Sequence, residues 1–154
     1  MTLNKKEQGL LKDLQNEEKL CVEKYRMASE KANDPQLKEM FSQISQEEQQ
    51  HYNTVTQMLG GTVPAENTAQ PKNRRQPKTP QQLKSTASRA GKQQDQYLLN
   101  DLLATEKFIA GNYNISVFEF SDEAARHALN AIQSQEQHHG KQLSEYMQAN
   151  GMYC

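Results

Sequence analysis

Six acidic and imidazole side chains recur at one spacing in the two halves of the chain. They are Glu18, Glu48, His51, Glu106, Glu136 and His139. In each half, a single Glu is followed 30 residues later by a Glu-x-x-His motif. Side chains three residues apart share one face of a helix, so both donors of such a motif can reach one metal ion. A single motif of this kind often arises by chance, but two copies at one spacing predict a two-metal site.

These six residues stand where the surrounding pattern calls for apolar side chains. Burying an ionised carboxylate is costly, and neighbouring carboxylates raise each other's pKa. Two divalent cations would balance four carboxylates beside two neutral imidazoles. Carboxylate oxygen together with imidazole nitrogen suits iron, manganese or zinc and does not choose among them. The alternatives are that the six lie on an exposed helix face or form a buried polar cluster without metal.

Two tyrosines and one cysteine accompany the motifs. Tyr25 and Tyr113 lie seven residues after Glu18 and Glu106, on the same predicted helix faces. As candidate catalytic residues, the tyrosines would hydrogen-bond a metal ligand or carry a transient radical. The alternative is a core tyrosine whose hydroxyl is paired. Cys21, one turn from Glu18, is expected to be a small buried hydrophobe, with a redox thiol as the alternative.

Three further polar residues near the motifs are expected at the surface. Glu47 and His138 precede Glu48 and His139 in sequence, but the helical pattern points them away from the buried face. His127 falls on an outward-facing position in the same way. For Glu47 and His138, the alternative is a third metal ligand or an entry site.

The elements that must position the donors follow from the spacing of the apolar residues. Along four segments this spacing alternates between three and four, as in helices packed in a bundle. We call the inward-facing positions the seam positions. In the first half they are Leu11, Leu14, Glu18, Cys21, Tyr25, Ala28, Ala32, Leu37, Phe41, Ile44, Glu48, His51, Val55 and Met58. In the second half they are Leu99, Leu102, Glu106, Ile109, Tyr113, Ser116, Phe120, Ala125, Leu129, Ile132, Glu136, His139, Leu143 and Tyr146. Four helices of about 25 residues, each about 37 Å long, are predicted.

The two halves resemble each other. A shift of 88 residues gives twelve identities over residues 10–59, without gaps. Such internal similarity predicts a duplicated helical hairpin. Asp34 and Pro35 are typical of an N-cap and the first residue of a helix, and Ser121 is expected to cap the fourth helix.

A basic segment separates the halves. Residues 60–80 contain Gly60, Gly61 and four of the five prolines, which no helix can run through. Their basic residues are Lys72, Arg74, Arg75 and Lys78. We expect a solvated extended connection, with a phosphate- or acid-binding arm as the alternative. Short loops within hairpins (about 3–59 and about 81–150) and one long crossover (about 60–80) describe an all-α, ferritin-like four-helix bundle, a single domain over 1–154.

The composition excludes several classes of protein. Of the 154 residues, 34% are hydrophobic, and 18 basic against 19 acidic residues leave a net charge of −1. Compositional disorder requires low hydrophobicity together with high net charge, and the high charge is missing. Twenty Gln and eleven Asn supply much of the polar content. The near-neutral charge argues against nucleic acid as a partner.

The sequence also bears on membrane insertion, secretion and cysteine-based sites. No apolar run approaches the roughly 20 residues that span a bilayer, so we expect no membrane association. No apolar segment follows the first residues, so no secretory signal peptide is expected. The two cysteines are too few for a disulfide scaffold or a four-cysteine metal site.

The six donors resemble those of the ferritin-like di-iron superfamily, which includes bacterioferritin, rubrerythrin and manganese catalase. The resemblance covers both hairpins and implies two divalent metal ions, iron first, with manganese or zinc as alternatives. Because the chain ends soon after the fourth predicted helix, we do not expect the extra helix of cage-forming ferritins or iron storage in a shell. The absence of a four-cysteine segment excludes a self-sufficient rubrerythrin.

The second half is similar to the spore coat protein F family of endospore-forming bacteria. The similarity covers about residues 95–154. It rests on Tyr97-Leu-Leu-Asn-Asp-Leu-Leu-Ala-Thr-Glu-Lys, Gly111-Asn-Tyr-Asn and Tyr146-Met-Gln-Ala-Asn-Gly-Met-Tyr153. Where that family typically ends in Gly-Trp-Tyr, this chain has Met152 between Gly151 and Tyr153. The resemblance implies a coat assembly component, found in the mother-cell cytoplasm or the spore coat. It also implies other coat proteins or further copies of the chain, as a homo-oligomer, as partners.

Two functional hypotheses follow. The first is a redox protein whose two metals react with oxygen or peroxide as an oxidase, peroxidase or catalase. The second is a structural coat protein whose metals are structural or vestigial, with exposed tyrosines and Cys154 available for assembly. An apo four-helix bundle is the remaining alternative.

Overall fold

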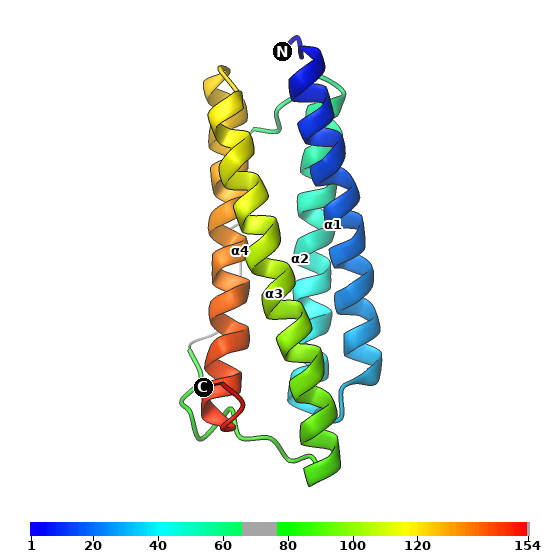
Figure 1. The fold of residues 1–154 in the computed structure, drawn as a ribbon, viewed down its shortest axis with the longest axis vertical. Coiled ribbons are helices and arrows are strands. Elements are labelled where there is room, and N and C mark those ends of the chain that lie inside the picture. The colour runs from blue at the N-terminus through cyan, green and yellow to red at the C-terminus, as the bar shows by residue number, and fades with distance from the viewer. Residues whose placement is uncertain (66–76, 154) are drawn as a thin grey trace.

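The four predicted helices are present in the structure, a computed structural model that describes residues 1–65 and 77–153. Helix α1 spans Lys5–Lys31, α2 Pro35–Leu59, α3 Arg89–Glu119 and α4 Glu123–Ala149. Figure 1 shows them side by side in one elongated bundle. Helix α1 packs on α2 and α3 on α4, and further contacts join α1 to α3 and α2 to α4. The chain is therefore an all-α four-helix bundle made of two hairpins.

The two hairpins are joined across the length of the bundle. In Figure 1, α2 ends near the N-terminus of the chain, whereas α3 begins at the opposite end. Of the basic residues in the predicted anion-binding alternative, Lys72, Arg74 and Arg75 lie outside the described residues, as does Cys154. Lys78 is described, and it donates to Gln36 Oε1 at 2.8 Å. Along the residues that are described, no helix combines the length and the apolarity needed to cross a membrane.

The helices begin where side chains can accept their first free N–H groups. Asn4 and Glu7 form a capping box on α1, with the backbone N–H of Glu7 donating to Asn4 Oδ1 at 2.8 Å. At the start of α2, Asp34 is the N-cap and Pro35 the first helical residue, as predicted.

The predicted cap of the fourth helix was wrong by one residue. The N-cap of α4 is Asp122, not Ser121, and the Asp122 carboxylate accepts the N–H of Ala125 at 2.9 Å. A carboxylate also interacts favourably with the positive end of the helix dipole. The shift of 88 residues already aligned Asp122 with Asp34.

Every predicted seam position is buried. The apolar side chains form two clusters, one containing Tyr25, Phe41 and Leu143 and the other containing Leu11 and Leu129. Along α2, α3 and α4, the Glu and His residues of the seam separate members of one cluster from members of the other. Along α1 the change of cluster comes one turn after Glu18, between Cys21 and Tyr25. The bundle thus has a polar layer between two apolar regions.

Helix α3 is fastened to the turn between α1 and α2. The buried carboxylate of Asp95 accepts the backbone N–H of Asn33 at 2.7 Å and that of Asp34 at 3.1 Å. One turn earlier, Gly91 allows close approach, since a Cβ there would lie 3.0 Å from the Cβ of Asn33. These contacts fix the position of α3 along the bundle axis relative to the first hairpin. They therefore also fix the position of Glu106.

Candidate metal centre

The structure brings all six predicted donors to one place in the bundle. We call them the carboxylate–histidine cluster: Glu18, Glu48, His51, Glu106, Glu136 and His139. Each helix contributes at least one member from its middle turns. The most exposed member, His51, has only 3% of its surface accessible. The alternative of an exposed helix face is therefore excluded.

The cluster divides into two groups of four donors. One group contains Glu18, Glu48, His51 and Glu136, and the other contains Glu48, Glu106, Glu136 and His139. Within each group, one ligand atom per residue lies within 4.8 Å of the others, so each group could hold a metal ion. Glu48 and Glu136 belong to both groups. Their two oxygens make them suited to bridge two neighbouring ions.

Both imidazoles turn the same nitrogen towards the carboxylates. His51 Nδ1 lies 2.6 Å from Glu136 Oε1 and 3.3 Å from Glu48 Oε2. His139 Nδ1 lies 2.8 Å from Glu48 Oε1 and 3.5 Å from Glu106 Oε1. The rings stack with their centroids 5.8 Å apart. Nδ1 is therefore the donor that each histidine would present to a metal.

The outward nitrogens have partners that sequence analysis missed. His139 Nε2 lies 2.5 Å from Glu47 Oε2, and His51 Nε2 contacts Gln135 Oε1. Glu47 was predicted to be a surface residue, but it is only partly exposed and its carboxylate reaches His139 on another helix. The shift of 88 residues aligns Glu47 with Gln135, but nothing in the sequence pairs either residue with a histidine of another helix. His138 and His127 are exposed, as predicted.

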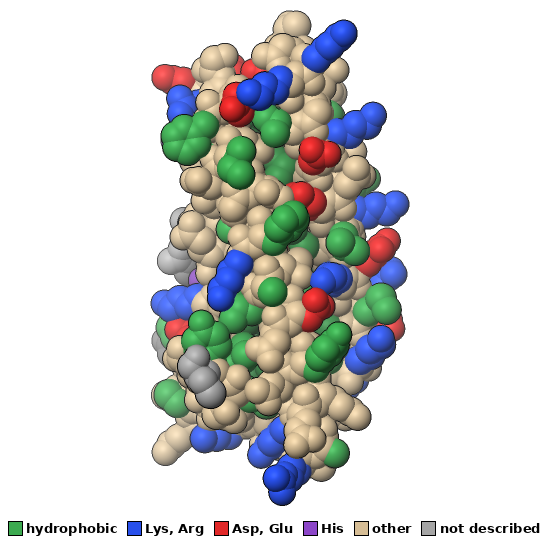
Figure 2. Space-filling model, in the orientation of Figure 1, with side chains coloured by type: hydrophobic (Ala, Val, Ile, Leu, Met, Phe, Trp, Pro, Cys, Tyr) green, Lys and Arg blue, Asp and Glu red, His purple; other side chains and the backbone are tan. Residues whose placement is uncertain are grey.

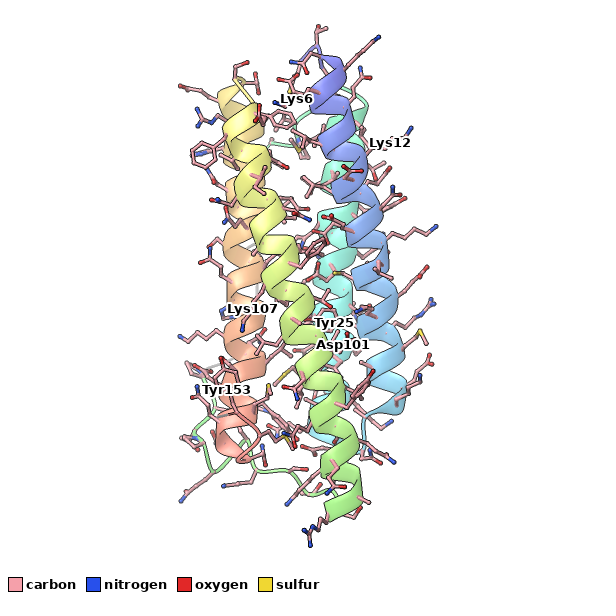
Figure 3. All side chains as sticks on the ribbon, viewed as in Figure 1. Lys6, Lys12, Tyr25, Asp101, Lys107 and Tyr153 are labelled. Atoms are coloured by element: carbon pink, nitrogen blue, oxygen red, sulfur yellow. The ribbon has the colours of Figure 1, made fainter. Side chains whose placement is uncertain are left out.

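The two tyrosines donate to candidate ligands of the opposite hairpin. Tyr25 on α1 donates to Glu106 Oε1 at 2.6 Å, and Tyr113 on α3 donates to Glu18 Oε1 at 2.6 Å. Figure 3 shows Tyr25 inside the bundle. Burial, then the charge of the accepting glutamate, raises the pKa of each tyrosine well above its usual value. Both hydroxyls therefore keep their protons and fix a carboxylate oxygen.

Burial and close contact perturb the titration of the carboxylates. Burial, reinforced by Glu48 and Glu136, raises the pKa of Glu18 well above its usual value. Burial, followed by the contact with Glu136, raises the pKa of Glu106 to about 7. Burial also opposes the charged form of Glu48, but hydrogen bonds from His139 and His51 outweigh it and lower its pKa to about 2.

The pKa values of the two histidines are also raised, but here burial acts against the shift and the carboxylate neighbours cause it. Burial disfavours the imidazolium, yet the contacts with Glu136 and Glu48 outweigh burial and raise the pKa of His51 to about 10. The pKa of His139 is also raised well above its usual value, by its carboxylate neighbours and against burial. Protons on these two rings therefore balance part of the negative charge that metal ions would otherwise balance.

Three glutamates of the cluster each have a carboxylate oxygen without a hydrogen-bond partner in the described part of the chain. Among the described residues, one oxygen (Oε2) of each of Glu18, Glu106 and Glu136 is buried without a hydrogen-bond partner. Leaving a buried carboxylate oxygen unsatisfied is costly, so native structures rarely do so without a ligand or ion. Carboxylate and imidazole donors around these free oxygens fit divalent transition metals.

The surroundings of Cys21 disfavour ionisation of its thiol. Its side chain is 1% exposed and packs in the apolar cluster with Leu11 and Leu129. Burial, then the neighbouring glutamates, raises the pKa of its thiol. The prediction of a small buried hydrophobe therefore agrees with its surroundings.

Part of the chain matches a known protein family. Residues 94–153 match the family model of the Coat F domain. The matched segment covers most of α3 and all of α4, and it includes Glu106, Glu136 and His139. No curated protein and no solved structure matches the chain.

Proposed function

We propose that the chain is a ferritin-like protein of the spore coat that binds two divalent metal ions. The observation that carries this proposal is the pair of four-donor groups sharing Glu48 and Glu136 in a buried layer. The free oxygens on three of the glutamates support it, because an ion between them would supply their missing partners. The Coat F match over α3 and α4 supports a place in the coat.

Each member of the cluster has a role in this proposal. Glu48 and Glu136 would contribute donors to both metal positions. Glu18 and His51 would complete one position, and Glu106 and His139 would complete the other. The hydroxyls of Tyr25 and Tyr113 hold one oxygen of each terminal carboxylate, which directs the other towards the ion. These residues thereby fix the donor geometry before any ion arrives, which reduces the cost of binding.

We propose iron as the first choice of metal and manganese or zinc as the alternatives, with oxygen or peroxide as substrate for an oxidase, peroxidase or catalase type of activity. A bound iron or manganese pair would supply the electron-transfer chemistry. The protein would contribute an enclosed, water-poor layer between two apolar regions. The tyrosine hydroxyls would hold the candidate ligands Glu106 and Glu18 through hydrogen bonds, with 2.6 Å between the two oxygen atoms in each.

Metal analysis of the purified protein tests the proposal. After anaerobic reconstitution with ferrous or manganous ion and removal of excess metal, we expect about two ions per chain. The variant Glu48→Ala/Glu136→Ala is expected to lose both, because each residue belongs to both groups. The matched control is Glu23→Ala/Glu145→Ala, which removes two exposed glutamates of the same bundle and should keep both ions.

The result that would contradict the proposal is a folded wild-type chain that retains no metal after reconstitution with either ion. Circular dichroism establishes that each variant is still helical. If the alanine variant unfolds, Glu48→Gln with Glu136→Gln keeps the side-chain volume and serves the same purpose.

A second candidate function is structural assembly in the coat. It is favoured by exposed apolar side chains on α3, within the matched segment: Tyr97, Phe108, Ile115 and Phe118, which are 58–75% exposed. Figure 2 shows hydrophobic side chains spread among charged ones over this face of the bundle. Metal-loaded protein that neither consumes peroxide nor oxidises ferrous ion, yet is recovered in spore-coat extracts, would favour this function over the redox one.

A further inference from the structure

The two halves of the carboxylate–histidine cluster differ in what supports the histidines. The outward nitrogen of His139 faces a carboxylate, Glu47, whose Oε2 lies 2.5 Å away. The outward nitrogen of His51 faces the amide oxygen of Gln135. These partners occupy corresponding positions under the shift of 88 residues, so the difference is one of charge at matched places.

The other supporting contacts are alike. Tyr113 donates to Glu18 at the same 2.6 Å at which Tyr25 donates to Glu106. Both groups share the same two central glutamates. The nearby acid Glu17 is turned away, with its Oε1 accepting from Asn112 at 2.6 Å. The inner donors of the two groups are therefore closely matched, and the outward partners of the rings are not.

The outward partner of a histidine affects its strength as a ligand. A carboxylate that accepts the ring N–H fixes the ring and increases the electron density at the other nitrogen. An amide oxygen fixes the ring in the same way but brings no net charge. About two-thirds of the Glu47 side chain is shielded from solvent, with 33% exposed, so its effect on His139 is only partly screened.

We propose that the two metal positions are unequal, and that the position completed by His139 and Glu106 binds a divalent transition metal more tightly because Glu47 supports His139. This inference rests on the proposed two-metal function. It makes Glu47 and Gln135 positioning residues that act through the histidines. Metal would then fill the centre in order, with the position at His139 first and the position at His51 second.

Titration of the metal-free protein with cobalt(II) alone tests the order. Calorimetry gives the affinities, and the visible absorption of cobalt reports the surroundings of each ion. For the wild type we expect two binding steps whose dissociation constants differ by about tenfold or more. His139→Gln should abolish the tighter step, and His51→Gln should abolish the weaker one.

Exchanging the charged and neutral side chains at Glu47 and Gln135 provides the matched controls. Glu47→Gln leaves amides at both places and should weaken the tighter step by about 10–100-fold, so that the two steps merge. Gln135→Glu should instead strengthen the weaker step. The double variant Glu47→Gln/Gln135→Glu should restore two unequal steps, with the tighter one now depending on His51. A purely structural role for Glu47 would not be rescued in this way.

Two results would overturn the inference, and they are distinct. Two equal steps in the wild type, unaffected by either substitution, would contradict the inequality while leaving the two-metal function intact. Failure of cobalt, iron and manganese to bind any folded variant would overturn the proposed function and the inference together.

Discussion

The hydroxyl of Tyr25 on α1 lies 2.6 Å from Oε1 of Glu106 on α3. The reverse contact, from Tyr113 on α3 to Glu18 on α1, has the same length. Each hairpin therefore supplies the hydrogen bond that holds a candidate metal ligand of the other hairpin. These two contacts couple the packing of α1 against α3 to the geometry of the carboxylate–histidine cluster.

Replacing Tyr25 by Phe should affect both stability and metal binding. Because the lost hydrogen bond is made to a buried acid, we expect the free energy of unfolding of the metal-free protein to fall by about 1.5–3 kcal/mol. The ligand that Tyr25 orients would also become mobile, and metal affinity should fall about tenfold. Urea denaturation and metal titration measure the two effects.

The control for this substitution is Tyr146→Phe. Tyr146 is equally buried and donates to Asp34 Oδ2 at 2.6 Å, away from the cluster. We expect a similar loss of stability with unchanged metal affinity. If both variants weaken metal binding equally, the effect of Tyr25 is general loosening of the bundle and its role in orienting Glu106 is refuted.

The metal-free protein should become less stable as the pH rises from about 5 to 9. The pKa of Glu106 is raised from its usual 4.5 to about 7, so the folded state holds a proton that the unfolded state has lost between these values. The pKa of His51, raised from 6.5 to about 10, extends the same trend upwards. Below about pH 4.5 the trend reverses, because Glu48, with a pKa of about 2, loses its favourable charge there.

Thermal denaturation of chelator-treated protein across this pH range measures the effect. The highest melting temperature is expected between pH 4.5 and 6. A variant with His51→Gln should show a shallower decline above pH 7. A melting temperature that rises steadily from pH 5 to 9 would contradict the assignment of protons to Glu106 and His51.

Metal binding should stabilise the bundle and alter this pH dependence. Free metal at 100 times its dissociation constant adds about 2.7 kcal/mol for one site. Because metal competes with protons for the histidine nitrogens, the stabilisation should grow as the pH rises from 6 to 8. Melting curves with and without metal measure it, and Glu48→Ala/Glu136→Ala should show no metal-dependent change.

Two glycines in α3 should respond to alanine in opposite ways. At Gly91, a Cβ would meet Asn33 at 3.0 Å, so we expect Gly91→Ala to lower the free energy of unfolding by about 1–3 kcal/mol. At Gly111, a Cβ would meet nothing within 4 Å, and alanine should stabilise the helix by about 0.5–1 kcal/mol. Chemical denaturation of the two variants measures both changes; stabilisation by Gly91→Ala would disprove the close approach of α3 to Asn33.

The helices and the cluster were predictable because both depend on local periodicity. The seam spacing placed Glu18 and Glu48 on buried faces, and burial at those positions is what the structure has. Contacts between helices could not be predicted from the periodicity of a single helix. Nothing local to Asp95 indicates that its carboxylate will cap the turn at Asn33, because the two residues are far apart in sequence. Glu47 was misplaced because the helix pattern alone does not reveal that His139 of another helix lies within its reach.

The polar layer between the two apolar regions also specifies how the four helices align lengthwise. A slip of one helix by seven residues, about 10 Å, would keep its apolar stripe facing inwards. It would, however, place Glu18 or its equivalents against leucine and phenylalanine side chains, and leave the remaining acids of the layer without their partners. Buried polar groups that are satisfied in a single arrangement are a well-attested means of fixing register. In this bundle, the layer gives one alignment an advantage that an uninterrupted apolar stripe would not provide.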